Sequence, residues 1–233
     1  MLIAPSEVHV WRAELDRPSA EIEQFVQILA PDEQQRSQRF RFEKDRKKFV
    51  IARGLLRTIL ARYLSVSSDR VLFSYSSKGK PAIANNYSAG ELFFNVSHSH
   101  NRALYAIALN RPVGIDLEYI RPIDATALSQ RFFLPSEAAF IQSLVGEDQH
   151  RSFFRGWTQK EAYLKATGDG LGGLESVEVA LVGSMGLVKV GGDVQIAAQW
   201  FVQEVAVNAA HNDDYAAALV VKGSQPDIHY FSI

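Results

Sequence analysis

Hydrophobic and polar residues along the chain follow two different spacings. In some segments apolar residues recur every three or four positions, as on one face of a helix, and in others every second position, as in a strand. The most regular helix is predicted over residues 46–64, because Leu56, Ile59, Leu60 and Tyr63 fall on one face. Further helices are predicted over residues 19–30, 32–42, 125–131, 135–144 and 150–167. Strands are predicted over residues 8–13, 71–75, 92–97, 103–109, 113–119, 177–182, 187–190, 198–207 and 215–221.

Two stretches of the chain repeat one order of elements. Ala30-Pro31-Asp32-Glu33 precedes one helix, Leu134-Pro135-Ser136-Glu137 precedes another, and each is followed by a longer helix and then by strands. The identity of the letters is weak, so the repeat is compatible with a duplicated fold without requiring one. If the duplication is real, the chain forms two similar α+β halves with a ligand-binding cleft between them. Residues 183–233 are then expected to complete the sheet of the second half.

The composition narrows the class of protein. Of the 233 residues, 47% are apolar and 22% are charged, which is typical of a soluble globular chain. The absence of cysteine excludes disulfides and thiolate chemistry. No apolar run approaches the roughly 20 residues needed to cross a bilayer, and the N-terminus lacks the features of a secretion signal. We therefore expect a cytoplasmic protein that does not act in a membrane.

The net charge of −1 hides an asymmetry along the chain. Residues 1–110 hold 16 basic and 11 acidic side chains, whereas residues 111–233 hold 9 and 15. Nine of the basic residues lie between Arg36 and Arg57. This distribution favours an anion, together with a cation, between the two halves. Because the pI is about 6.6, a compact polyphosphate fits better than nucleic acid, and a solvated helix face is the simpler alternative.

A first candidate site lies in Gly114-Ile115-Asp116-Leu117-Glu118. On a strand, Asp116 and Glu118 point to the same face. Two neighbouring carboxylates raise each other's pKa unless a cation holds them ionised, and Mg²⁺ characteristically binds one or two carboxylates together with phosphate oxygens. A solvated strand face remains the alternative interpretation.

A second candidate lies in the helix that contains Trp157-Thr158-Gln159-Lys160-Glu161-Ala162-Tyr163-Leu164-Lys165. Glu161 and Lys165 are four residues apart, which is also the spacing of an ordinary surface salt bridge. The segment that follows contains four glycines between residues 168 and 173. Such a run ends a helix and lets the backbone approach a ligand closely.

A third candidate is the polar end of a strand, Phe94-Asn95-Val96-Ser97-His98-Ser99-His100-Asn101. His98 and His100 share a face and could bind a transition metal. The serines and asparagines could instead cap the strand end, or Ser97 and His98 could contact a phosphate. Residue types alone do not decide between these three uses.

Taken in order, these segments resemble the 4′-phosphopantetheinyl transferases, in particular the long, two-lobed type that activates surfactin synthetase. The resemblance covers roughly residues 30–180. It rests on Lys78-Gly79-Lys80-Pro81, Phe94-Asn95-Val96-Ser97-His98-Ser99, Gly114-Ile115-Asp116-Leu117-Glu118, and residues 157–165 with Gly168-Asp169-Gly170-Leu171. Each motif is weak alone, but four in family order are specific. The resemblance implies two pseudo-twofold-related α+β halves, residues 1–110 and 111–233. It also implies transfer of 4′-phosphopantetheine from coenzyme A to a carrier-protein serine, releasing 3′,5′-ADP.

The resemblance also implies roles for individual residues. Asp116, Glu118 and Glu161 match the family's Mg²⁺ cluster, and Lys165 matches the lysine that contacts the pyrophosphate and assists the leaving group. Glu161 is also expected to help deprotonate the serine. The positions that match coenzyme A contacts are Arg36, Lys48, Lys80, Ser97, His98 and Lys165. Glu33 departs from the pattern, because the family can have a basic residue there, and this puts the contacts to the 3′-phosphate in doubt.

The expected partners are coenzyme A and an apo acyl- or peptidyl-carrier protein, with no nucleic acid and no membrane, and the chain is expected to be a monomer. The sequence does not indicate which carrier or pathway is served. Two other functions stay open. One is a metal-dependent hydrolase built on His98, His100 and Asp116, and the other is a non-catalytic module that binds coenzyme A or a carrier.

Overall fold

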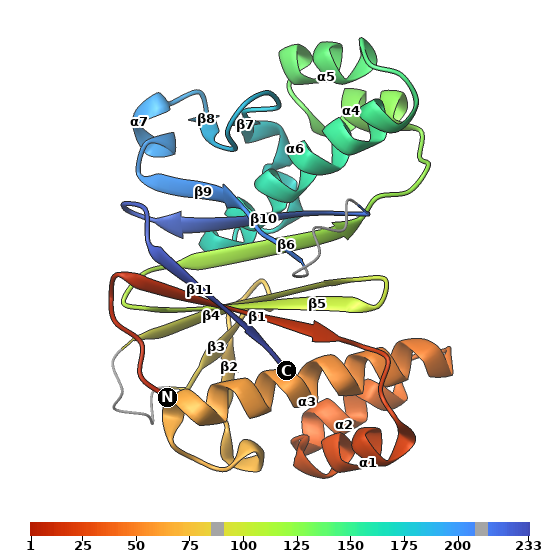
Figure 1. Cartoon of the computed structure of the whole chain (residues 1–233), viewed down its shortest axis with the longest axis vertical. Helices are drawn as coiled ribbons and strands as arrows, with labels where there is room; N and C mark the ends of the chain where they lie inside the picture. The colour runs from red at the N-terminus through yellow and green to blue at the C-terminus, as the bar shows by residue number, and fades with distance from the viewer. Residues whose placement is uncertain (85–90, 208–213) are drawn as a thin grey trace.

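The computed structural model describes residues 1–84, 91–207 and 214–233. It consists of four layers, in which two sheets face each other and helices cover both outer faces (Figure 1). The first half supplies the lower layers in this view. Its elements are β1 (Glu7–Glu14), α1 (Ser19–Ile28), α2 (Pro31–Gln38), α3 (Glu43–Leu64), a 3₁₀ turn (Ser68–Arg70), β2 (Phe73–Tyr75), β3 (Pro81–Ile83), β4 (Leu92–Ser99) and β5 (Arg102–Leu109).

The second half repeats this order and supplies the upper layers (Figure 1). Its elements are β6 (Val113–Tyr119), α4 (Ala125–Phe132), α5 (Pro135–Gln142), α6 (Gly146–Thr167), a 3₁₀ turn (Leu171–Ser176), β7 (Val177–Val179), β8 (Leu187–Val190), α7 (Val194–Ala197), β9 (Trp200–Glu204) and β10 (Tyr215–Lys222). The last strand of the chain is β11 (Asp227–Ser232).

The two sheets share one topology. In the first, β1 pairs antiparallel with β5, which pairs antiparallel with β4; in the second, β6, β10 and β9 pair in the same way. The long helices α3 and α6 both contain 22 residues. The predicted α+β fold with two similar halves is therefore confirmed, and the weak sequence repeat corresponds to a real duplication.

The C-terminal strand corrects one expectation. Residues 183–233 were predicted to complete the second sheet, but β11 pairs in parallel with β1 and extends the first sheet. No separate strand was predicted over residues 227–232, and the assignment of this stretch to the second sheet was wrong for it, because the sequence does not show which sheet edge a strand joins. Residues 208–213, which fall inside the same stretch, lie outside the described residues.

Helix ends also differ from the predictions. Helix α6 begins at Gly146, four residues before the predicted start, and α2 ends at Gln38, before the predicted end at residue 42. Both α2 and α5 begin with a proline followed two residues later by a glutamate. The Glu33 carboxylate accepts the backbone N–H of Ala30, and Glu137 accepts that of Leu134, which caps the two helices in the same way.

The hydrophobic core lies in the layers between these elements. Facing apolar side chains fill the space between the sheets, among them Val8, Val10, Ile115 and Leu219. Helix α6 packs directly against β6 at Gly114, where an added Cβ would lie 1.9 Å from the Ala162 carbonyl oxygen. No helix in the described part of the chain is long and apolar enough to cross a membrane.

Candidate active site

The predicted catalytic residues meet where α6 crosses β6 beside the edge strand β4. Asp116 and Glu118 alternate with the apolar residues of β6 that face the other sheet, so both carboxylates point toward α6. Glu161 and Lys165 lie one turn apart on α6. Tertiary packing therefore joins two motifs about 45 residues apart in the sequence.

Hydrogen bonds connect this group. The Lys165 ammonium lies 2.6 Å from Asp116 Oδ1 and donates to Ser97 Oγ at 2.9 Å. Ser97 Oγ donates to Asp116 Oδ1 at 2.8 Å, and Ser99 Oγ donates to Glu118 Oε2 at 3.0 Å. Asp116 is 3% exposed, so its pairing with Lys165 takes place out of bulk solvent. Ser99 was not predicted as a site residue; its position two residues after Ser97 on the same strand face was the available signal.

The pKa values of the two neighbouring carboxyl groups, Glu118 and Glu161, are raised, which favours their neutral forms. Burial, and then the negative charges of Asp116 and Glu118, raise the pKa of Glu161 to about 7, although Lys165 opposes this. The pKa of Glu118 is also raised, first by burial and then by Asp116. These shared effects indicate that the carboxylates interact electrostatically and that one lysine does not balance them.

The donor set fits a hard divalent cation. Asp116 Oδ2 is buried and has no hydrogen-bond partner among the described residues, although it belongs to an ionisable group. Burial and neighbouring negative charge raise the pKa values of Glu118 and Glu161, and a bound cation would relieve this effect. As the side chains stand, no three His, Asp or Glu residues in the described ranges are grouped as a metal site.

The predicted cationic contacts lie on either side of this group. Lys80, from the β2–β3 hairpin, donates to the Ala166 carbonyl at the end of α6, and burial lowers the pKa of Lys80. Lys48, on α3, donates to the His100 carbonyl at the end of β4. Arg36, on α2, lies over the Phe49 ring, with its guanidinium carbon 5.4 Å from the ring centroid.

His98 points away from Asp116, since it neighbours Ser97 on the strand. Its pKa is lowered, first by desolvation and then by the charges of Lys165 and Lys48, which places it in a positive environment. His100 stacks on Tyr119 with ring centroids 4.9 Å apart. Among the described residues, neither histidine is grouped with other His, Asp or Glu side chains as a metal site, which is equally true of the three carboxylates.

Part of the predicted basic surface is internal. Arg57 is only 1% exposed and pairs with Glu33, which also pairs with Arg53. The alternative of a solvated helix face is therefore wrong for Arg57. Glu33, which departs from the family pattern, is a buried structural residue here: it caps α2 and balances two arginines.

A cavity of about 270 Å³ lies between the two halves, next to Glu161 and Lys165. Its lining includes Lys78, Lys80 and Pro81 from the hairpin and Glu161, Lys165 and Gly168 from α6 and its end. Lys78 also donates to the Asp169 carbonyl. The start of the glycine run after α6 therefore lies next to the hairpin and lines the same cavity.

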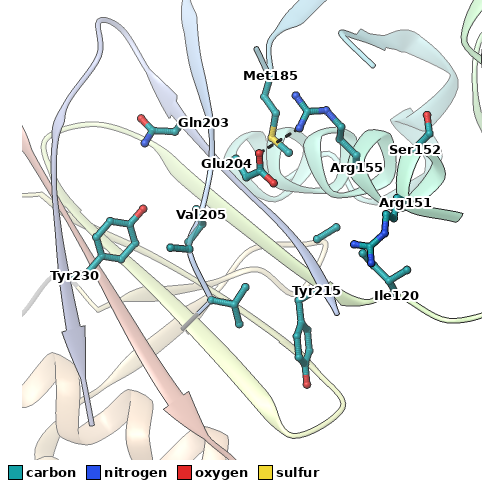
Figure 2. Close-up of a pocket in the computed structure, with 13 residues that line it drawn as sticks. Ile120, Arg151, Ser152, Arg155, Met185, Gln203, Glu204, Val205, Tyr215 and Tyr230 are labelled. Carbon is teal, nitrogen blue, oxygen red and sulfur yellow. Dashed lines mark hydrogen bonds and ion pairs between the residues drawn. The ribbon is translucent and has the colours of Figure 1, made fainter. Parts of the chain in front are cut away.

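A second cavity, of about 560 Å³, lies on another side of the second half (Figure 2). It is lined by residues of α6, β9 and β10 and by Tyr230 of β11, and Arg155 pairs with Glu204 inside it. None of the predicted site residues lines this cavity.

Comparison with known proteins decides the family. A model described as the 4′-phosphopantetheinyl transferase superfamily matches residues 112–220, and one described as 4′-phosphopantetheinyl transferase, N-terminal, matches residues 11–109. The chain is 42% identical to 4′-phosphopantetheinyl transferase HetI of Nostoc sp., over 96% of this chain and 91% of that one. The chain belongs to the 4′-phosphopantetheinyl transferases.

More distant relatives carry the same name. Identity is 33% to psf-1 of Bacillus pumilus, over 69% of this chain and 67% of that protein, and 29% to Sfp of Bacillus subtilis, over 67% and 69%. The predicted activity of this transferase, transfer of 4′-phosphopantetheine from coenzyme A to a carrier protein, is confirmed at the level of the family.

Proposed function

We propose that the transferase is Mg²⁺-dependent and that its reaction takes place where β4, β6 and α6 meet. The observation that carries the proposal is the buried contact of Lys165 with Asp116, beside Glu118 and Glu161, whose pKa values are raised. A lysine and several carboxylates in one partly desolvated place suit cleavage of a pyrophosphate, because such reactions are catalysed mainly by positioning and charge neutralisation.

Asp116, Glu118 and Glu161 would hold the metal ion. When bound, Mg²⁺ neutralises charge on the pyrophosphate of coenzyme A and polarises the phosphate that receives the serine oxygen. The unpartnered Asp116 Oδ2 supports this assignment, since the atom is buried and able to accept a ligand contact.

Lys165 supplies positive charge from the protein itself. We assign its ammonium to the pyrophosphate and to the 3′,5′-ADP that departs, where it neutralises the charge that develops on the leaving oxygen. Its present partners, Ser97 and Asp116, hold the long side chain at the site before substrate binds.

Glu161 is the proposed base that removes the proton of the carrier serine, directly or through a water. Without a bound cation its pKa of about 7 leaves it partly ionised at neutral pH, and a cation at the neighbouring carboxylates would increase the ionised fraction that can accept a proton. The protein reaches this pKa by burying Glu161 beside two other carboxylates.

Coenzyme A itself is assigned to the positive residues around the cavity. Lys80 and His98 would contact its phosphates, and Lys48 and Arg36 lie on the α3 and α2 side, where the 3′-phosphate would extend. Ser97 was predicted among these contacts, but protein groups use all of its hydrogen-bonding capacity. We therefore assign it no phosphate contact.

Several broader features belong to the same proposal. The substrate is a serine of an apo acyl- or peptidyl-carrier protein. The enzyme works as a cytoplasmic monomer without nucleic acid or a membrane, and its functional halves are residues 1–110 and 111–233. The basic first half would provide the phosphate contacts, and the acidic second half the metal and the base.

The test is to incubate the purified protein with coenzyme A, MgCl₂ and a panel of apo acyl- and peptidyl-carrier proteins, and to weigh the carriers by mass spectrometry. We expect at least one carrier class to gain a phosphopantetheine group, with loss of the reaction in EDTA and in Lys165→Ala. Lys189→Ala is the control, because Lys189 lies in β8 and pairs with Glu178. Unchanged transfer in EDTA would remove the metal from the mechanism.

A further inference from the structure

The edge of β6 that faces β4 is covered in an unusual way. Its other edge forms a regular ladder with β10. On the β4 side, three alternate backbone N–H groups are satisfied by side chains: Ile115 N by Asn95 Oδ1 at 3.0 Å, Leu117 N by Ser97 Oγ at 3.2 Å, and Tyr119 N by Ser99 Oγ at 3.0 Å. Side chains that repeat every two residues on β4 therefore match N–H groups that repeat every two residues on β6. We call Asn95, Ser97 and Ser99 the β4 row.

Two members of the β4 row make a second contact. Ser97 donates its hydroxyl proton to Asp116, and Ser99 donates to Glu118. Each serine thus accepts from the backbone N–H of one residue and donates to the carboxylate of the residue before it. Asn95 shares the backbone contact but, among the described residues, makes no hydrogen bond to a carboxylate.

The geometry points to Ser97 and Ser99 as positioning residues that hold Asp116 and Glu118 in the orientation needed to bind the metal ion. Each hydroxyl is fixed by the β6 backbone, so its proton is directed at one carboxylate oxygen. At Asp116, this bond and Lys165 both reach Oδ1 and leave Oδ2 without a partner. Groups that hydrogen-bond to metal-ligating carboxylates typically change metal affinity or activity by about 10–100-fold.

The duplicated fold provides an internal comparison. In the second sheet, Gln203, Val205 and Val207 occupy the places that correspond to the β4 row, judged by the pairing of β9 with β10. They line the cavity of Figure 2, and two of them have no hydrogen-bonding side chain. At β1 the corresponding edge is paired with the backbone of β11, so no side chain has to satisfy it. Acceptance from the β6 backbone explains a polar residue at each place of the β4 row, and donation to Asp116 and Glu118 is what Ser97 and Ser99 add to it.

This inference rests on the proposed function, and the experiment separates the two. Ser97→Ala, Ser99→Ala and Asn95→Ala are compared by binding of Mn²⁺, followed by electron paramagnetic resonance in the presence of coenzyme A, and by urea unfolding. All three variants lose a bond to the β6 backbone and should lose stability. Only the serine variants should weaken Mn²⁺ binding, by about 10–100-fold, and Ser99→Thr, which keeps the hydroxyl, should restore it.

A second readout separates positioning from structure. The serine variants should lower kcat at saturating coenzyme A and carrier, whereas the KM for the carrier should change little. If Asn95→Ala weakens Mn²⁺ binding as much as the serine variants do, or if the serine variants bind Mn²⁺ like the wild type, the positioning role is wrong. If the wild type transfers no phosphopantetheine, the proposed function fails instead.

Discussion

The two halves of the molecule share a scaffold and differ in the side chains that it carries. The shared part includes a buried ion pair: Arg57 of α3 pairs with Glu33, and Lys160 of α6 pairs with Glu137. Arg57 and Lys160 occupy the same position along their 22-residue helices. Both also donate to backbone carbonyls around the following 3₁₀ turn, Arg57 to Ser68 and Val71, and Lys160 to Leu174 and Val177. Both halves have therefore kept the same buried ion pair, with the same hydrogen bonds to the turn that follows the long helix.

The difference appears on the adjacent helix and strand faces. By strand register and helix position, the counterparts of Asp116, Glu118, Glu161 and Lys165 are Trp11, Ala13, Thr58 and Arg62. In place of the contact between Lys165 and Asp116, the first half has the Arg62 guanidinium 4.8 Å from the centre of the Trp11 ring. The first half folds with aromatic and neutral residues at three of the four places, so this scaffold does not by itself call for carboxylates there. This favours a chemical role for them.

The halves also differ at corresponding strand edges. The outer edge of β1 is paired with the backbone of β11, whereas the corresponding edge of β6 is covered by the β4 row. A backbone ladder brings no side chains toward the strand it covers. Side-chain pairing brings hydroxyl groups to the carboxylates of β6, so the functional half uses the version that adds chemistry.

The largest expected effect is on kcat, and it should distinguish Glu161 of α6 from Thr58, which occupies the equivalent position in α3. Glu161→Gln should lower kcat by about 10²–10⁴-fold, because a positioned base contributes that much. Thr58→Val, at the matching place in α3, should leave kcat unchanged, since Thr58 bonds to its own helix at Gly54. Single-turnover mass spectrometry of the carrier measures both variants. Equal losses in the two would contradict the division of labour between the halves.

The shared ion pairs should both stabilise the protein. Lys160→Ala should lower the free energy of unfolding by about 3–5 kcal/mol, because it leaves the buried Glu137 carboxylate without its partner. Arg57→Ala should lower it by less, because Arg53 still pairs with Glu33. The exposed pair of Lys47 with Glu43 is the control, and Lys47→Ala should cost at most about 1 kcal/mol. Urea unfolding measures all three. A large cost in one half with none in the other would show that the two ion pairs are not equivalent.

Glu161 should add a pH effect that its counterpart Thr58 in the first half cannot produce. The pKa of Glu161 is about 7 in the folded protein against an ordinary value of 4.5, so between these pH values the folded state binds more protons than the unfolded state. The free energy of unfolding should therefore fall as the pH rises from about 4.5 to 7, by on the order of 3 kcal/mol relative to Glu161→Gln. Urea titrations in metal-free buffer measure the difference. Parallel curves for the two proteins would mean that Glu161 has an ordinary pKa.

A smaller effect concerns the close packing of α6 on β6. Gly114→Ala should cost about 1–3 kcal/mol, because its Cβ would meet the Ala162 backbone, and transfer should fall as Asp116 shifts. Gly186→Ala is the matched control, since a Cβ there meets nothing within 4 Å. Thermal unfolding and carrier modification measure both variants. A Gly114→Ala protein as stable and active as Gly186→Ala would show that the helix can move away freely.

Local patterns predicted much of this molecule. The periodicity located all the long helices, since an apolar face that recurs over several turns has few alternatives. Alternation along residues 113–119 placed Asp116 and Glu118 on one face, as found. Charge and spacing did not reveal that Arg57 of the basic helix is buried, because an arginine that faces solvent and one that pairs with a buried glutamate look alike in the sequence. They also missed Ser99, whose partner Glu118 lies on a separate strand.

The sequence alone located the long helices and most strands and indicated the family, because hydrophobic spacing and short motifs are local properties of the sequence. It was compatible with duplicated halves, which the tertiary structure established. Only the tertiary structure decided which groups meet. It joined Lys165 to Asp116, paired β11 with β1, and set the β4 row against the edge of β6. These contacts depend on how sheets and helices pack across long sequence separations, and burial then sets properties such as the pKa of Glu161, which no local pattern contains.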